Sequence, residues 1–430
     1  IRDDQTAGCK AVPGLESSFD FDHADPNSAD ACCDPAAPNF GCNFKGVTDN
    51  FTNSIGSVPD TTPFFKPYGG WPGDPSWGIA SVVIPNVLVT MLDEPADDEL
   101  YGLAKDYIDF LAFHSDKDYD GLISFGYYGD WCNLPGGSPA AVEQVTSWSQ
   151  VYALEKFVEL ARKAGRDGDA EEYGTTLRKL KAAYHHRFWS NATKSYGSSQ
   201  TGSLLPLYLS GIVPLELQED ASKALLDSLN ANDNHIKCGL VGTAYILQAL
   251  QKTGHSKVAL DLALETSYPS WGYMLEQGPG TFWETWNNGT NSHNHPMFSA
   301  SIGPYLYSLA GLDVGSWSHG VLAFDLDPDT VQRVGSASLT MTRSAGASAF
   351  AWKARPDGIE AEVVIPHGEV VEVSLVKLGE GHCHQLLHQN RFVWLGCASN
   401  KWMHADCASM GLQSVSDEDM PASKKVKLRL

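Results

Sequence analysis

The residues best suited to chemistry gather between Tyr268 and Phe298, in a segment rich in Gly, Asn and Pro. Indole rings pack against the apolar faces of sugar rings, while carboxylate, imidazole and amide groups bind sugar hydroxyls. Cleavage of a glycosidic bond also requires a pair of carboxyl groups. The composition therefore predicts a sugar site, in which Glu284, placed between two Trp residues, is the first catalytic candidate. The residues of this group are Trp271, Glu276, Trp283, Glu284, Trp286, His293 and His295.

A second group of aromatic residues lies far upstream, in PYGGWPGDPSWG with Trp77 and in FGYYGDWC with Asp130 and Trp131. Gly and Pro interrupt both segments, so we expect loops, and loops on a rigid scaffold commonly carry binding residues. The alternative for each Trp is a place in the core, where large aromatic residues usually lie. The acidic residues beside these aromatic residues favour sugar binding, and Trp77, Asp130 and Trp131 are predicted substrate contacts.

Composition limits the kinds of partner. The chain has 430 residues, of which 43% are hydrophobic, enough for a buried core and for more than one domain. Its formal net charge of -22 would repel nucleic acid and anionic membrane surfaces, so a neutral or cationic small substrate is expected. No run of about 18 apolar residues predicts a membrane span, and residues 1–30 show no export signal.

Two features point to an oxidising compartment. Four of the nine Cys residues crowd the first 42 positions, as in many secreted proteins. Three Asn-x-Ser/Thr motifs begin at Asn50, Asn191 and Asn288. An extracellular or secretory location is therefore predicted, and a cytoplasmic protein with reduced thiols is the alternative.

Apolar residues recur at helical spacing from Ile79 to about Leu312, with breaks at Gly, Pro or Asp. Helix follows helix through short turns, which predicts αα-hairpins. Hairpins that close into an (α/α)6 toroid would gather the Trp- and Glu-bearing loops at one mouth. The catalytic domain is assigned to residues 61–315, after an irregular segment at 1–60.

After Asp313 the period changes from 3.6 to 2. Five alternating segments with turns between them predict a small antiparallel β-sandwich over residues 316–380. Residues 381–430 lose both periods and are predicted to form an atypical tail.

No metal site or cofactor is predicted. Asp116–Gly121 matches the first half of a calcium-binding loop, D-x-D-x-D-G, but the twelfth position is Tyr127 instead of Glu. An Asp- and Gly-rich turn between helices is the preferred interpretation.

With these motifs in hand, residues 60–315 resemble the catalytic domain of α-L-rhamnosidases, an (α/α)6-barrel glycoside hydrolase family. The resemblance rests on ordered matches that include SVPD, DPSWG, YGDW, GLVGTAYILQAL, TFWETW and SHNHPMF. It implies that Glu284 is the general base that activates water. It also implies that Trp77 and Trp131 line the sugar pocket, together with Asn294 and His295.

The N-terminus departs from the family pattern. Family members carry the general acid in an R-D-E-R-x-G-W-x-G-D stretch, whereas here only Ile1–Gln5 comes near it, with Asp4 in place of the Glu. Asp is one carbon shorter, so the proton donor would lie more than about 1 Å farther from the glycosidic oxygen. Asp4 is nevertheless the candidate acid.

The resemblance implies an inverting exo-α-L-rhamnosidase that removes terminal rhamnose from glycosides or polysaccharide side chains without a cofactor. The alternative is a rhamnoside-binding pseudoenzyme, which the altered acid motif suggests.

Overall fold

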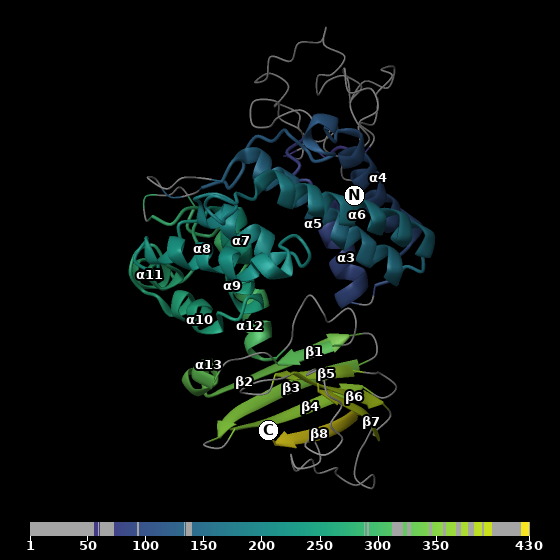
Figure 1. Cartoon of the computed structure of the whole chain (residues 1–430). Coiled ribbons are helices and arrows are strands. Elements are labelled where there is room, and N and C mark those ends of the chain that lie inside the picture. Colours follow the sequence, from purple (N-terminus) through teal and green to yellow (C-terminus); the bar gives the residue numbers. More distant parts are fainter. Residues whose placement is uncertain are drawn as a thin grey trace, which may run out of the picture.

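The computed structural model describes residues 56–58, 60, 73–92, 94–132, 134, 140–287, 289, 292–311, 321–324, 328–343, 346–355, 358–366, 371–376, 382–388, 391–397 and 423–429. Helices form the larger body and strands the smaller one (Figure 1). Within these residues, none of the helices has the length and apolarity needed to cross a bilayer.

In the described part of the helical body, helices are joined by short turns and by three short 3-10 segments. These elements are α3 (Ala80–Met91), α4 (Asp98–Phe113), η2 (Lys117–Tyr119), α5 (Val142–Lys163), α6 (Asp167–Phe188), α7 (Gln200–Tyr208), η3 (Leu215–Leu217), α8 (Gln218–Asn230), α9 (Leu240–Lys252), α10 (Ser256–Leu264), α11 (Trp271–Gln277), η4 (Pro296–Ser299) and α12 (Ile302–Leu309).

An inner row of helices forms the core of this body. In chain order, α3 packs on α5, α5 on α7, α7 on α9 and α9 on α12, while α4, α6, α8 and α10 flank them on the outside. The inner helix α5 is buried over most of its length, whereas α6 buries only one stripe of residues. This arrangement of helical hairpins confirms the mainly α fold expected from the sequence.

Local sequence explains where several helices begin. Asp97 accepts a hydrogen bond from the backbone N–H of Leu100 at the start of α4, and Ser270 does the same for Tyr273 at the start of α11. These N-caps satisfy N–H groups that have no partner inside the helix. Helix α9 has no such cap from its own N-cap residue, Gly239. Its cap comes from a distant segment, described below.

Helices α7 and α11 lie within the helical region expected from the sequence, but neither shows a clear helical period of its own. Every residue of α7 from Gln200 to Leu207 is buried, and Pro206 lies inside the helix. A helix buried on all sides has no polar stripe, so the periodicity that reveals the others is missing. Helix α11 has only seven residues, which is too short for a clear period.

The strands form two four-stranded sheets, ordered β1-β5-β6-β7 and β2-β3-β4-β8. Strand β1 pairs with β5 in parallel, which differs from the purely antiparallel arrangement expected, and the short helix α13 follows β1. Strands β6, β7 and β8 continue the sheets into residues 381–430, where the sequence predicts an atypical tail. The bounds are β1 (Val321–Phe324), α13 (Pro328–Val334), β2 (Ser336–Arg343), β3 (Gly346–Arg355), β4 (Gly358–Pro366), β5 (Val371–Val376), β6 (His382–His388), β7 (Arg391–Cys397) and β8 (Ser423–Arg429).

The two bodies share a buried contact at the end of α12. The indole N–H of Trp352 on β3 donates to the carbonyl of Leu309 at 2.7 Å. Gly311 follows with a positive φ of 96°, and a Cβ there would lie 2.2 Å from the ring of Phe350. A residue without a side chain is therefore needed where the chain leaves the helices.

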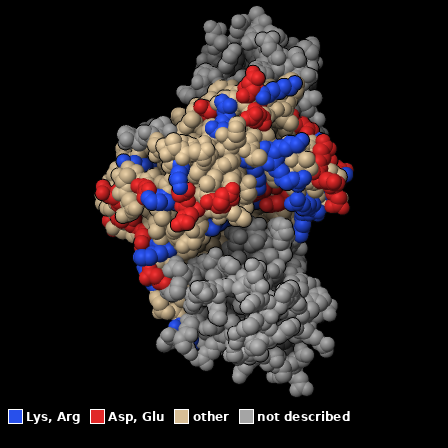
Figure 2. All heavy atoms as spheres, in the orientation of Figure 1, with Lys and Arg blue, Asp and Glu red and all other residues tan. Residues whose placement is uncertain are grey.

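Charges of both signs are interspersed over the helical face shown in Figure 2. The large negative net charge of the whole chain is therefore not expressed as one acidic patch on that face. Long-range steering by a field of a single sign is not expected there, since neighbouring charges of opposite sign cancel.

Candidate functional site

Asp74 fixes the turn that carries the upstream aromatic residues. One oxygen of its buried carboxylate accepts from the backbone N–H groups of Tyr127 at 2.6 Å and Tyr128 at 3.1 Å. The other accepts from the backbone of Ser76 at 2.8 Å. Asp60 accepts from the backbone N–H of Asp74 at 2.6 Å and from the hydroxyl of Tyr128 at 2.9 Å. Burial and the bond to Asp60 raise the pKa of Tyr128, so its hydroxyl stays protonated and keeps donating to Asp60.

Trp77, Tyr128 and Trp131 together form what we call the aromatic surface. The ring centroid of Tyr128 lies 4.4 Å from that of Trp77 and 5.6 Å from that of Trp131. Trp77 is 36% exposed and Trp131 is 44% exposed, so both indoles remain accessible to a ligand. The structure thus brings two predicted sugar contacts together. Tyr128, which the sequence reasoning did not commit to as a site residue, joins them.

Asp130, a predicted substrate contact, bonds to protein groups in this fold. Its carboxylate is buried and accepts from the backbone N–H groups of Gly239 at 2.8 Å and Gly242 at 2.9 Å, and from the hydroxyl of Thr201. Burial raises the pKa of Asp130, and these hydrogen bonds oppose the shift. Because its partners are protein groups, Asp130 caps α9 and joins that helix to the start of α7.

The capped helix in turn positions Trp131. The backbone N–H of Leu240, the first residue of α9, donates to the carbonyl of Trp131 at 2.8 Å. A Cβ at Gly239 would lie 2.3 Å from that carbonyl oxygen, so only glycine allows the approach. Asp130 therefore acts on the aromatic surface through the backbone of its neighbour.

Trp271 and Trp283, two further predicted sugar contacts, lie buried in the core. Trp271 is 4% exposed and donates its indole N–H to the carbonyl of Phe298 at 2.7 Å. Trp283 is fully buried and packs on the ring of His293, with centroids 4.9 Å apart. Trp286 is also buried. A buried indole has no accessible face, so these residues hold the loop around Glu284 in place.

Glu284 lies next to the turn that carries Trp131. Its side chain is half-buried, and its backbone N–H donates to the carbonyl of Ser292 at 3.0 Å. Cys132 follows Trp131 directly, and burial raises the pKa of its thiol, with the negative charges of Glu284 and Asp130 adding to the shift. Hydrogen bonds join the two segments: the indole N–H of Trp286 donates to the carbonyl of Cys238 at 3.0 Å, and the residues that follow Cys238 bond to Asp130 and to the carbonyl of Trp131. Two segments far apart in sequence are therefore neighbours at this site.

The other predicted site residues differ in how exposed they are. His295 is half-buried and donates its backbone N–H to the carbonyl of Phe282 at 2.9 Å, which places it in the same loop layer as Glu284. The side chains of Asn294 and Glu276 are exposed, and their substrate contacts stay predictions. Asp4 lies outside the described residues.

The arrangement supplies two carboxylates beside exposed aromatic rings. Glu284 lies near the Trp131 end of the aromatic surface, and Asp60 binds the hydroxyl of Tyr128. Sequence reasoning did not select Asp60, although it belongs to the SVPD match that supports the family resemblance. Exposed rings can pack against the apolar face of a sugar, and a nearby carboxylate can bind a hydroxyl or accept a proton.

Successive helical hairpins whose loops gather aromatic and carboxylate side chains define the class of six-hairpin glycosidase domains. Residues 43–310 match the bacterial alpha-L-rhamnosidase 6 hairpin glycosidase domain, and the chain belongs to this family.

Similar proteins bear the same family name. An alpha-L-rhamnosidase of Streptomyces avermitilis is 26% identical over 332 residues, which cover 74% of this chain and 31% of that protein. The solved alpha-L-rhamnosidase from Dictyoglumus thermophilum superposes with a TM-score of 0.65 at 29% identity, covering 76% of this chain and 37% of the other. A Streptomyces avermitilis alpha-L-rhamnosidase complexed with L-rhamnose gives 0.60 at 25% identity, covering 72% and 30%. The chain thus spans about a third of the length of the curated relatives it matches.

Proposed function

We propose that this chain is an exo-acting α-L-rhamnosidase that removes terminal α-L-rhamnose from glycosides with inversion of configuration. The observation that carries the proposal is the placement of Glu284 beside an exposed aromatic surface, in a chain of this family.

In the proposed reaction, Glu284 is the general base. Its carboxylate removes a proton from a water molecule as the water attacks the anomeric carbon, while the aromatic surface holds the sugar ring. An inverting enzyme needs room for that water, so its two carboxyl groups lie about 6.5–9.5 Å apart. Asp4 is the proposed acid, which protonates the departing oxygen. No step in this scheme requires a cofactor.

The test is the Glu284→Gln variant, assayed with p-nitrophenyl α-L-rhamnoside. Loss of a positioned base should lower turnover by about 10²–10⁴-fold, while L-rhamnose still binds. Glu172→Gln, on the exposed side of α6, is the matched control and should retain full turnover. Turnover of Glu284→Gln within threefold of the parent would remove Glu284 from this role.

The second candidate is a pseudoenzyme that binds rhamnosides without cleaving them. The departure of Asp4 from the family acid motif favours it. The parent chain separates the two candidates: L-rhamnose binding without release of p-nitrophenol supports the pseudoenzyme, and release supports the hydrolase. Inversion is tested by the anomer first formed, which NMR detects before mutarotation.

We also propose an extracellular or secretory location. The crowding of Cys residues near the N-terminus and the three Asn-x-Ser/Thr motifs support it. Asn191 is exposed, as a glycosylation site requires. The proposed partner is a carbohydrate, and nucleic acid is disfavoured by the negative charge.

A further inference from the structure

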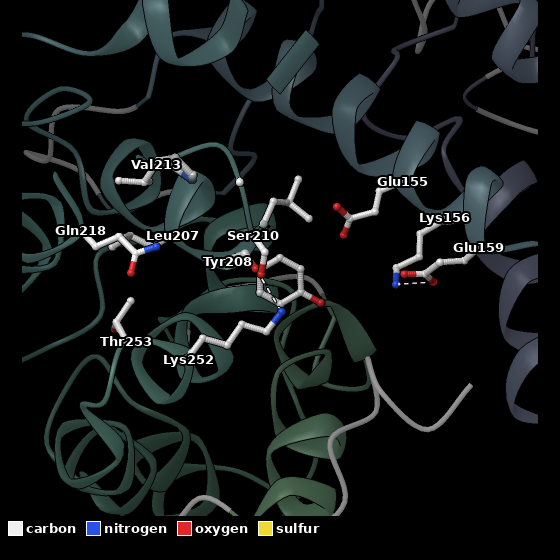
Figure 3. A pocket seen from close by; sticks show the side chains of 13 residues that line it. Glu155, Lys156, Glu159, Leu207, Tyr208, Ser210, Val213, Gln218, Lys252 and Thr253 are labelled. Carbon is white, nitrogen blue, oxygen red and sulfur yellow. Dashed lines mark hydrogen bonds and ion pairs between the residues drawn. The ribbon is translucent and has the colours of Figure 1, made fainter. Parts of the chain in front are cut away.

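A cavity lies at the ends of the inner helices α7 and α9 that are remote from Asp130. It has a volume of about 410 Å³ and is lined by α5, the end of α7 with the residues that follow, and the end of α9 (Figure 3). Asp130 contacts the first turns of α7 and α9, at Thr201 and Gly242. Lys252, which lines the cavity, lies ten positions after Gly242, so these two residues are about 15 Å apart along α9. The cavity is therefore distinct from the candidate active site.

Two ion pairs form one side of this cavity. Lys156 pairs with Glu159 at 2.9 Å, and the two side chains are 14% and 17% exposed. Glu155 pairs with Lys181, whose ammonium also donates to the carbonyl of Ser210 at 2.7 Å. Removing charged groups from water is costly unless new hydrogen bonds replace those to water. A polar ligand could form such bonds with these partly buried pairs.

Tyr208 and Lys252 form the other side. The Lys252 ammonium donates to the Tyr208 carbonyl at 3.0 Å and lies 4.3 Å from the centre of its ring. Figure 3 shows the Glu155 carboxylate and the Tyr208 hydroxyl on facing sides of the open space. The Tyr208 ring also packs against Tyr245, with centroids 4.6 Å apart, and this contact fixes its position.

The lining carries charges of both signs. It contains the cations Lys156 and Lys252 and the anions Glu155 and Glu159, and Lys181, which pairs with Glu155, lies beside it. An ammonium offers three donors and a carboxylate about four acceptor positions, more than the bonds of Glu159 to Lys156 and to the amide of Asn86 use. An anion would meet two carboxylates and a cation two ammonium groups. An apolar ligand would desolvate all four without replacing their hydrogen bonds.

We infer that this cavity binds a neutral polyhydroxy molecule, a sugar or a small polyol. Each hydroxyl can accept from an ammonium and donate to a carboxylate, which matches a lining of mixed sign. A volume of 410 Å³ lies within the range of small-molecule sites, about 300–1,000 Å³. Binding here involves no turnover and is independent of the proposed hydrolysis.

The test uses the full chain carrying Trp131→Ala, which weakens the candidate active site, and measures ligand binding by saturation-transfer NMR. The probes are L-rhamnose, glycerol and the anion L-rhamnonate. Two further changes probe the cavity: Lys252→Met removes one cation, and Ser210→Trp fills the space. Because Ser210 contributes a backbone carbonyl to Lys181, replacing its side chain preserves that hydrogen bond.

In the Trp131→Ala chain, the binding of a neutral probe at this cavity is the part that Ser210→Trp removes. Lys252→Met should weaken that part about tenfold, and both variants should keep the melting temperature unchanged. Binding of L-rhamnose alone would identify a sugar site, and binding of glycerol as well a polyol site. Failure of both neutral probes, preference for L-rhamnonate, or binding unaffected by Ser210→Trp would each overturn the inference.

Discussion

Replacing Asp130 by Ala tests whether this carboxylate is structural or binds substrate. The change removes the acceptor shared by the backbone N–H groups of Gly239 and Gly242 and by the hydroxyl of Thr201. All three donors belong to buried residues. They would then lose a partner in a place where water has little access.

The cost can be worked from these three bonds. A buried donor left without a partner costs about 1–3 kcal/mol, so three give about 3 kcal/mol at the low end. The variant also removes the buried carboxylate, whose charged form burial disfavours, as the raised pKa of Asp130 shows. This gain offsets part of any cost above the low end. We therefore expect Asp130→Ala to lower the free energy of unfolding by about 3 kcal/mol.

Urea unfolding followed by far-UV circular dichroism measures the change, provided that the slope of the transition stays the same. Glu172→Ala, on the exposed side of α6, is the control and should change stability by less than about 0.5 kcal/mol. A loss below about 1 kcal/mol for Asp130→Ala, combined with abolished rhamnose binding, would refute the structural role and restore the sequence-based prediction of a substrate contact.

Two further predictions concern the same site. Trp131→Ala should leave melting nearly unchanged but weaken L-rhamnose binding by about fivefold or more, because its indole is exposed, whereas Trp283→Ala should cost about 3–5 kcal/mol, because its indole is fully buried. Equal melting temperatures for the two variants would contradict these placements. Burial, and then the charge of Glu284, raise the pKa of Cys132. The rate of Cys132 alkylation, measured by peptide mass spectrometry, should therefore rise only at a higher pH than the rate for an ordinary thiol. Glu284→Gln removes that charge and lowers the Cys132 pKa, so alkylation at a fixed alkaline pH should become faster; an unchanged rate would mean that the two groups are not neighbours.

Much of the helical body follows from the sequence. The segment from Asp98 to Phe113 shows one apolar face and an Asp cap at its start, and it forms a helix over those residues. Helix α7 could not be found in this way, because it is buried on all sides and contains Pro206. The pairing of β1 with β5 could not be found either, since alternation predicts strands but not their neighbours.

The site residues divide by accessibility, which composition does not reveal. Trp77 and Trp131 stay exposed in loops, whereas Trp271 and Trp283 are buried. All four lie in similar Gly-rich segments with acidic neighbours, so residue type alone could not separate them. The difference arises because Trp271 begins α11 and donates to a carbonyl inside the body, while Trp131 follows the buried Asp130 and points outward.

One buried carboxylate connects stability with the site. Asp130 bonds to the first turns of α7 and α9, and the next residue, Trp131, accepts from the first residue of α9. The aromatic surface is therefore positioned by the contact that holds two inner helices together. A change that separates α7 from α9 should displace Trp131 as well, so loss of stability and loss of sugar binding should occur together in variants of this turn. Variants of the outer helices, such as those at Glu172, should instead leave sugar binding intact, because the hydrogen bonds of Asp130 run to α7 and α9.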